Sequence, residues 1–316
     1  MSGLLERRLL FVSGKGGVGK STIAASLALL ASQQGKRTLL CEVDAKGNLA
    51  DFFETGPTGF KPREIQPRLF AMSMDTEESL KEYLSLQLKI PLLARLGPLA
   101  RMFDFVATAA PGVKEILTVG KFVWETRRQT YDLIVVDAVA TGHVVGQLRA
   151  PQAINELVQV GLVREQTGWM IDILTDPDTT GVVVTASPEE MPVVESLELL
   201  DNLEVTDVDV AAVVVNRVLP ELFGRGEEEV FERLRTPELS TALAAATGGH
   251  VGPVLDAARL AVTLRRTGAE HLERLRAGLP GGLPVLYVPE LFSRTHGLRA
   301  THQVADALGA ELGVGV

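Results

Sequence analysis

The sequence has very little cysteine and no excess of positive charge. Its single cysteine, Cys41, excludes an internal disulfide and a zinc site built from paired cysteines and histidines of one chain. Because Cys41 lies in the apolar run TLLCEVD, we expect a buried, unreactive thiol. Lys and Arg number 31 against 40 Asp and Glu, for a formal charge of −9. This balance argues against a surface that binds nucleic acid through its phosphates.

Long apolar runs and a basic tail are also missing. No apolar stretch reaches the length of a membrane span, and the N-terminal residues run into a glycine-rich motif without a cleavable signal. The C-terminal segment HQVADALGAELGVGV has no Lys or Arg, which argues against a basic amphipathic membrane helix there. We therefore expect a cytoplasmic protein. With 316 residues that are 46% hydrophobic, the chain can form a sizeable core.

Short β-branched runs alternate with longer helical patterns along the chain. This alternation predicts an α/β fold with a doubly wound, mainly parallel sheet and an inserted helical layer. The expected strands are residues 9–13, 38–43, 69–74, 133–137, 181–186, 208–216 and 284–288. Residues 51–67 are expected to form a loop. We predict a single domain over residues 1–316, with helical segments at about 76–130 and 150–175 and further helices at about 221–278.

Residues 14–21, GKGGVGKS, match the phosphate-loop pattern G-x-x-x-x-G-K-[ST] between an expected strand and an expected helix. In such a loop, backbone N–H groups and the helix N-terminus bind phosphate oxygens. Lys20 is expected to bind the β- and γ-phosphates, and Ser21 to ligate Mg²⁺. The expected contacts with the nucleotide are Gly14, Gly16, Gly17, Val18, Gly19, Lys20, Ser21 and Thr22. The motif leaves a second lysine, Lys15, unexplained; a solvated loop cation is the alternative to a functional role.

Polar side chains end three of the expected strands. Asp137 follows the run LIVV, where an acid would bind Mg²⁺ directly or through water. Asp44 follows a second run and is expected to orient the attacking water rather than to abstract its proton. For both aspartates the alternative is a loop or helix cap; Asp51 and Glu42 are more ambiguous, and a helix N-cap is at least as good an interpretation of Asp51.

Asn216 ends the third of these strands, DVAAVVVN. An amide side chain can pair with both a donor and an acceptor on adenine, so Asn216 is a candidate reader of the base. From the residues alone, an asparagine that forms a turn explains the position equally well.

Together these segments resemble the deviant Walker A ATPases of the ArsA family, which includes the arsenical pump ATPase and the tail-anchored protein targeting factor. The loop fits the family's K-G-G-x-G-K-[ST], with Lys15 as the signature lysine. VDAKGNLAD resembles the family's T-D-P-A-x-S-L-S-D segment, DAVATGH resembles D-T-A-P-T-G-H, and APGVKEI resembles P-G-x-x-E. VVVNR resembles the strand that carries the adenine-reading asparagine, and PVLYVPELFSRTHGL is a weaker match to the C-terminal strand and nucleotide-edge loop.

The resemblance implies ATP and Mg²⁺ as ligands and a nucleotide-gated dimer. Lys15 would reach the phosphates of the partner subunit, Asp44 would be the water-positioning residue of switch I, and residues 137–143 would form switch II. The base would contact Asn216, Arg217, Pro289 and Leu291. In the targeting branch the helical layer forms a client groove; residues 93–110 could line one here, although core or dimer contacts are the more ordinary role for such a pattern.

Departures from the family pattern limit what can be transferred. The switch I proline is Ala45 here, and switch II has Ala138, Val139 and Ala140 in place of Thr-Ala-Pro, so hydrolysis is expected to be slow. With one cysteine, neither zinc nor arsenite is an expected ligand. His143 is interpreted as a switch hinge or core-facing polar residue rather than as a metal ligand.

Two hypotheses about function follow. The first is an ATP-hydrolysing switch that gates the binding of a protein or membrane client. The second is a weakly catalytic regulatory subunit that binds nucleotide and supports a paralogous partner ATPase, so that the dimer is either a homodimer or a heterodimer.

Overall fold

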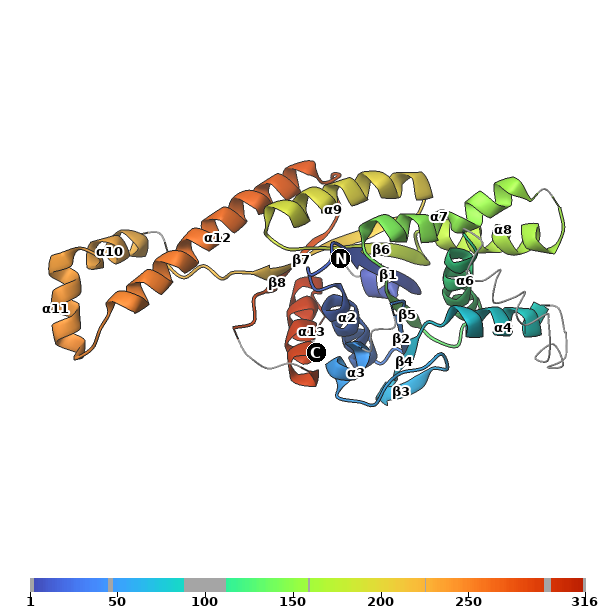
Figure 1. Cartoon of the computed structure of the whole chain (residues 1–316), viewed down its shortest axis with the longest axis horizontal. Coiled ribbons are helices and arrows are strands. Elements are labelled where there is room, and N and C mark those ends of the chain that lie inside the picture. Colours follow the sequence, from blue (N-terminus) through green and yellow to red (C-terminus); the bar gives the residue numbers. More distant parts are fainter. Residues whose placement is uncertain are drawn as a thin grey trace.

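The computed structural model describes residues 3–44, 48–87, 112–158, 160–224, 226–292 and 297–314. Its centre is an eight-stranded sheet in the order β3-β4-β2-β5-β1-β6-β7-β8 (Figure 1). The strands are β1 (Leu9–Gly14), β2 (Thr38–Glu42), β3 (Arg63–Gln66), β4 (Leu69–Ser73), β5 (Leu133–Asp137), β6 (Thr180–Ala186), β7 (Val210–Val218) and β8 (Val285–Pro289). Only the β3–β4 pair among these is antiparallel. The expected α/β fold with a mainly parallel sheet is confirmed.

The central strands are buried along their whole length. Every residue of β1, β2, β5 and β6 is buried, as expected for parallel strands with helices on both faces. Their continuous β-branched and aliphatic sequences suit this environment, because no position has to face water. The apolar runs therefore predicted the strands in the middle of the sheet to within one or two residues.

Helices cover both faces of the sheet (Figure 1). One hydrophobic cluster joins the sheet to α2 (Lys20–Gln33), α3 (Asn48–Phe53) and α13 (Leu298–Leu312). The cluster on the other face includes residues of α6 (Val113–Arg127), α7 (Thr141–Leu157), α8 (Leu162–Thr175), α9 (Glu190–Leu203) and α12 (Gly252–Gly278). The short helices α1 (Gly3–Glu6) and η2 (Glu204–Thr206) and the longer α4 (Thr76–Gln87), α10 (Glu227–Leu234) and α11 (Pro237–Thr247) complete the elements.

Two expectations about local structure are wrong. Residues 51–67 are not one loop, because they contain the last residues of α3 and the edge strand β3. The sequence of β3, REIQ, is polar and partly exposed, so it lacks the apolar signal of a buried strand. Asp51 lies inside α3 rather than at its N-cap. The segment 93–110, considered above as a possible groove lining, lies outside the described residues.

Each predicted helical segment contains helices in its described part, and residues 88–111 of the first segment lie outside the described residues. Residues 76–130 and 150–175 contain α4, α6 and α8, and α7 begins earlier, at Thr141, and continues through Pro151. Figure 1 shows α10, α11 and the first part of α12 extending beyond the edge strand β8, and α11 buries none of its side chains. The division of the chain into one domain stays a prediction. No helix in the described part of the chain combines the length and apolar character needed to cross a membrane.

The environment of Cys41 generates a prediction about reactivity. Cys41 is fully buried in β2, and burial raises the pKa of its thiol far above its usual value. Since the thiolate is the reactive form, a thiol reagent such as Ellman's reagent should label the native protein at least about a thousandfold more slowly than the denatured protein. Labelling followed against urea concentration should coincide with global unfolding measured by circular dichroism. Rapid labelling without denaturant would contradict this assignment.

Candidate functional site

The glycine-rich loop, residues 14–21, connects β1 to α2, as the motif requires. Gly17 and Gly19 have φ angles of 90° and 94°, in the left-handed region that favours glycine. The side chain of Lys20 turns back over the loop, where its Nζ donates a hydrogen bond of 3.1 Å to the carbonyl oxygen of Lys15. The loop therefore curls around the first turn of α2, which is the arrangement that binds phosphate.

The backbone of this loop lies unusually close to β6 and β7. A Cβ on Gly14 would lie 2.1 Å from the carbonyl oxygen of Thr185, and a Cβ on Gly19 would lie 2.2 Å from Nδ2 of Asn216. Asn216 is buried and donates a hydrogen bond of 2.9 Å from Nδ2 to the carbonyl oxygen of Val18. The amide thus supports the loop in this structure, and its proposed contact with a base stays a prediction.

The carboxylates expected at the strand ends lie next to this loop. Asp137 ends β5 and is in register with Glu42 at the end of β2, and Asp44 follows two residues later. Asp137 accepts a hydrogen bond from Ser21. The pKa of Asp137 is raised to about 6, chiefly by burial; the Ser21 hydrogen bond and the charge of Lys20 lower the pKa, and the charges of Glu42 and Asp44 raise it. Glu42 is buried and accepts a hydrogen bond from Ser73.

These side chains fit a magnesium ion. Carboxylate and hydroxyl oxygens are the ligands that Mg²⁺ prefers. Asp137 is a buried carboxylate with a raised pKa. It accepts a hydrogen bond from Ser21 and lies near the acids Glu42 and Asp44, so its surroundings favour the binding of a cation. Ser21 and Asp137 are therefore the residues that would hold the ion. Among the described residues, no group of three or more His, Cys, Asp or Glu side chains is arranged to hold a metal ion, here or elsewhere, so the assignment rests on Ser21 and Asp137.

The second lysine of the loop binds a residue that sequence reasoning did not find. Nζ of Lys15 lies 2.5 Å from Oε1 of Glu195, in the middle of α9. The two side chains are 29% and 28% exposed, so the ion pair lies at the edge of the protein rather than in its core. The two residues are 180 positions apart in the sequence, so no local sequence pattern indicates that they pair.

The segment after β5 is attached to β1. The hydroxyl of Ser13 donates to the carbonyl oxygen of Val139 at 2.8 Å, and the N–H of Ala138 donates to the carbonyl oxygen of Val12 at 3.0 Å. Ala138 is buried, whereas His143 is exposed in the first turn of α7. The interpretation of His143 as a core-facing residue is therefore wrong, and that of a hinge residue stays a prediction.

The remaining predicted contacts gather at the carboxyl ends of β7 and β8. Arg217 is exposed with a φ angle of 60°, and Pro289 lies in register with Val218. Leu291 is half-buried against the core. Arg217 and Pro289 thus extend the sheet edge that carries Asn216, and their roles in binding a base stay predictions.

The raised pKa of Asp137 generates a prediction about stability. In the unfolded chain the pKa is near 4, so between about pH 4 and pH 6 ionisation of Asp137 costs the folded state up to about 3 kcal/mol. This cost is absent below that range and fully present above it. Asp137→Asn should therefore raise the free energy of unfolding, relative to wild type, more at pH 7.5 than at pH 4.5. Urea denaturation in EDTA without nucleotide measures the free energy of unfolding of both proteins. A difference between Asp137→Asn and wild type that is equal at both pH values would contradict the prediction.

Comparison with known proteins places this arrangement in a family. A family model described as "Anion-transporting ATPase" matches residues 7–171 and 159–235. The chain is 32% identical over 224 residues to the protein named ATPase BagA of Mycobacterium tuberculosis, covering 67% of this chain and 66% of that protein. It is 28% identical over 251 residues to ATPase GET3 of Phaeosphaeria nodorum, covering 67% and 77%.

A similar match is found with the ATPase ASNA1 homolog of Entamoeba dispar, at 26% identity over 253 residues. The chain spans about two thirds of the length of BagA. The two stretches matched by the family model together span residues 7–235, which is more than half of the 316 residues, and they contain β1, the glycine-rich loop, α2, β5 and β7. The protein therefore belongs to the ArsA family of anion-transporting ATPases.

Proposed function

We propose that the protein is an ATP-hydrolysing dimeric switch of the cytoplasm, whose nucleotide state gates its binding to a protein or membrane client. Family membership supports nucleotide binding, and the relatives whose names include ATPase support hydrolysis. The proposal for this chain rests on the site itself: a glycine-rich loop, a buried strand-end acid and a second lysine at the start of the loop.

The position of Lys15 carries the proposal. Its Nζ is directed to Glu195 on α9 and not back over its own loop, where Lys20 lies. A partly exposed cation at this edge can reach the phosphates of a second subunit that docks there. Charge on the γ-phosphoryl oxygens spreads in the transition state, so a cation supplied by the partner stabilises it in the way an arginine finger does.

Each remaining site residue then has a role in hydrolysis. The loop N–H groups and Lys20 bind the phosphates, and Ser21 and Asp137 hold the magnesium ion. When bound, this ion neutralises charge on the phosphate oxygens. Asp44, at the end of β2, positions the attacking water, and Asn216, Arg217, Pro289 and Leu291 flank the base. Without the cross-subunit contact, each site lacks one of its two phosphate-binding lysines.

One observation favours the second candidate, a weakly catalytic regulatory subunit that supports a paralogous ATPase. Ala138 follows the magnesium-binding acid directly and is 4% exposed, so this position offers no hydroxyl to phosphate or to a magnesium-bound water. In that case the protein would form a heterodimer, and its own turnover would be low while its affinity for ATP remained high.

Substitution of the two lysines separates binding from catalysis. Lys20→Ala should abolish ATP binding and turnover, because Lys20 neutralises the phosphates directly. Lys15→Ala should retain ATP affinity within about tenfold but lower turnover by about a hundredfold or more, the scale of a finger residue. Phosphate release measures turnover, and light scattering measures mass in ADP and in ADP–aluminium fluoride.

The expected result is a dimer in the transition-state mimic that Lys15→Ala fails to form. An assembly that is unchanged in every state and variant would exclude the cross-subunit role. Tight ATP binding by the wild type with no turnover above that of Lys20→Ala would favour the regulatory subunit, and turnover without any paralogue would argue against it.

The ion pair of Lys15 predicts a separate effect on dimer formation. To reach a partner, Lys15 must leave Glu195, and a partly exposed pair contributes up to about 1 kcal/mol. Glu195→Gln should therefore lower the ATP concentration needed for half-maximal dimer formation by about two- to fivefold, as followed by light scattering. Glu198→Gln, which removes one negative charge from an exposed position of the same helix, is the matched control. Equal shifts in both variants would indicate a general charge effect, and weaker dimer formation in Glu195→Gln alone would show that Glu195 stabilises the dimer.

A further inference from the structure

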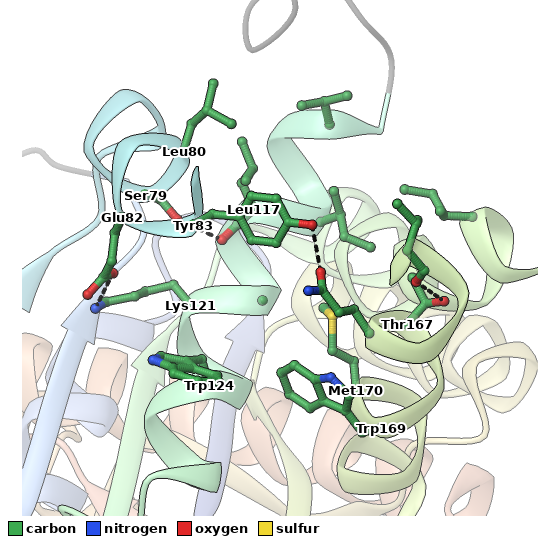
Figure 2. A pocket seen from close by; sticks show the side chains of 16 residues that line it. Ser79, Leu80, Glu82, Tyr83, Leu117, Lys121, Trp124, Thr167, Trp169 and Met170 are labelled. Carbon is green, nitrogen blue, oxygen red and sulfur yellow. Dashed lines mark hydrogen bonds and ion pairs between the residues drawn. The ribbon is translucent and has the colours of Figure 1, made fainter. Parts of the chain in front are cut away.

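A cavity of about 400 Å³ lies between helices α4, α6, α7 and α8 (Figure 2). Its wall is mainly apolar and includes Ile116, Leu117, Met170 and two tryptophans. Trp124 of α6 and Trp169 of α8 are in contact, with ring centroids 6.3 Å apart and ring planes tilted by 57°. None of the lining residues belongs to the nucleotide site described above, so the cavity needs an explanation of its own.

The hydroxyl groups of the wall already have acceptors. Ser79 donates to the carbonyl oxygen of Leu117 at 3.1 Å, and Thr167 donates to Oδ1 of Asn155 at 2.8 Å. The hydroxyl of Tyr83 donates to Oε1 of Gln166 at 2.6 Å, the bond drawn from Tyr83 in Figure 2. Burial raises the pKa of Tyr83, so this hydroxyl keeps its proton at neutral pH. These groups leave no spare donor for a ligand.

Two N–H donors of the wall, in contrast, lack an acceptor among the described residues. They are Nε2 of Gln166, a residue that is only 8% exposed, and Nε1 of Trp124. A buried donor without a partner costs the folded state about 1–3 kcal/mol. Both nitrogens carry N–H groups that can donate a hydrogen bond, and neither nitrogen can accept one. A ligand that complements this wall therefore carries a hydrogen-bond acceptor.

The charges of the wall favour a neutral ligand. Lys121 is buried, and its Nζ lies 2.6 Å from Glu82 and 2.8 Å from Glu125. Lys121 is the one cation among the described lining residues, and it is thus paired with two carboxylates, of which Glu82 itself lines the cavity. The described wall therefore offers an anionic ligand no free cation, which makes its entry strongly unfavourable.

The volume of the cavity suits a small molecule rather than a helix. Small-molecule sites have volumes of about 300–1,000 Å³. A helix about 10 Å across occupies roughly 400 Å³ in each 5.4 Å turn, so this cavity could hold about one turn. A membrane-spanning client segment needs about 20 residues.

We propose that this cavity binds a neutral lipophilic molecule that carries a carbonyl oxygen. The oxygen accepts a hydrogen bond from the Gln166 amide, and the apolar body lies among the aliphatic side chains and the tryptophan pair. This site is independent of the ATP site, so it can be tested whether or not the protein hydrolyses ATP.

The test uses Prodan, a neutral naphthalene with one carbonyl group whose emission shifts to the blue in apolar surroundings. Titration of the full chain should give saturable binding with a blue shift. Gln166→Leu is made together with Tyr83→Phe, because Gln166 Oε1 accepts the hydrogen bond of the Tyr83 hydroxyl, which would otherwise become a free donor. The double variant should bind Prodan about five- to tenfold more weakly than Tyr83→Phe alone. Diphenylhexatriene, a lipophilic probe without oxygen, should bind both proteins equally.

Leu117→Trp should weaken Prodan binding, because the larger side chain occupies part of the cavity. Leu260→Trp is the matched control, since the same replacement is made at an exposed position of α12. Thermal unfolding followed by circular dichroism verifies that each variant is folded. Prodan affinity that Leu117→Trp leaves unchanged would place the probe elsewhere and overturn the proposal. Equal Prodan affinity in Tyr83→Phe and in Tyr83→Phe with Gln166→Leu would show that the amide does not bind the carbonyl oxygen, and would overturn that part of the proposal. Tighter binding of the anionic cis-parinaric acid would exclude a neutral ligand.

Discussion

The close contact between the glycine-rich loop and strands β6 and β7 determines the shape of the whole site. The loop backbone at Gly14 and Gly19 approaches Thr185 and Asn216 too closely for any Cβ to fit between them. The sheet therefore constrains the curvature of the loop at both glycines. Because the sheet is parallel here, the same edge also carries Asp137, and the acid lies beside Ser21 as a consequence of strand register.

Helix α7 connects this edge of the sheet with the helical layer. It begins at Thr141, directly after the segment that Ser13 holds through Val139, and it contributes Ile154 to the cavity wall. α7 has 17 residues and includes Pro151, so its first turn lies beside the nucleotide site and its later turns lie in the helical layer. The two sites proposed for this protein are thus joined by a single element, although they share no residue.

The sequence predicted those parts of the structure that depend on local patterns. Continuous apolar runs predicted the central strands, and the loop motif predicted the junction of β1 and α2. The sequence does not predict the edge strand β3, because a strand has an apolar sequence when its side chains are buried and not merely when its backbone pairs in a sheet; the side chains of β3 are exposed or half-buried. The partner of Lys15 could not be predicted, since α9 contains Glu190, Glu195 and Glu198 and only the fold selects one of them. The cavity was equally hidden, because its wall is assembled from four helices.

The burial of α2 has a consequence for how a signal can leave the nucleotide site. Ten consecutive residues of this helix, from Ile23 to Ser32, are buried, so it is enclosed on every side by the sheet, α3 and α13. Its small side chains leave neither space nor an exposed face along which it could slide or rotate. The helix that begins at Lys20 is therefore held by packing on all sides. Lys15, on the opposite rim of the site, is partly exposed, so we expect a movement that follows the loss of a phosphate to begin there and in the residues after Asp137 rather than in α2.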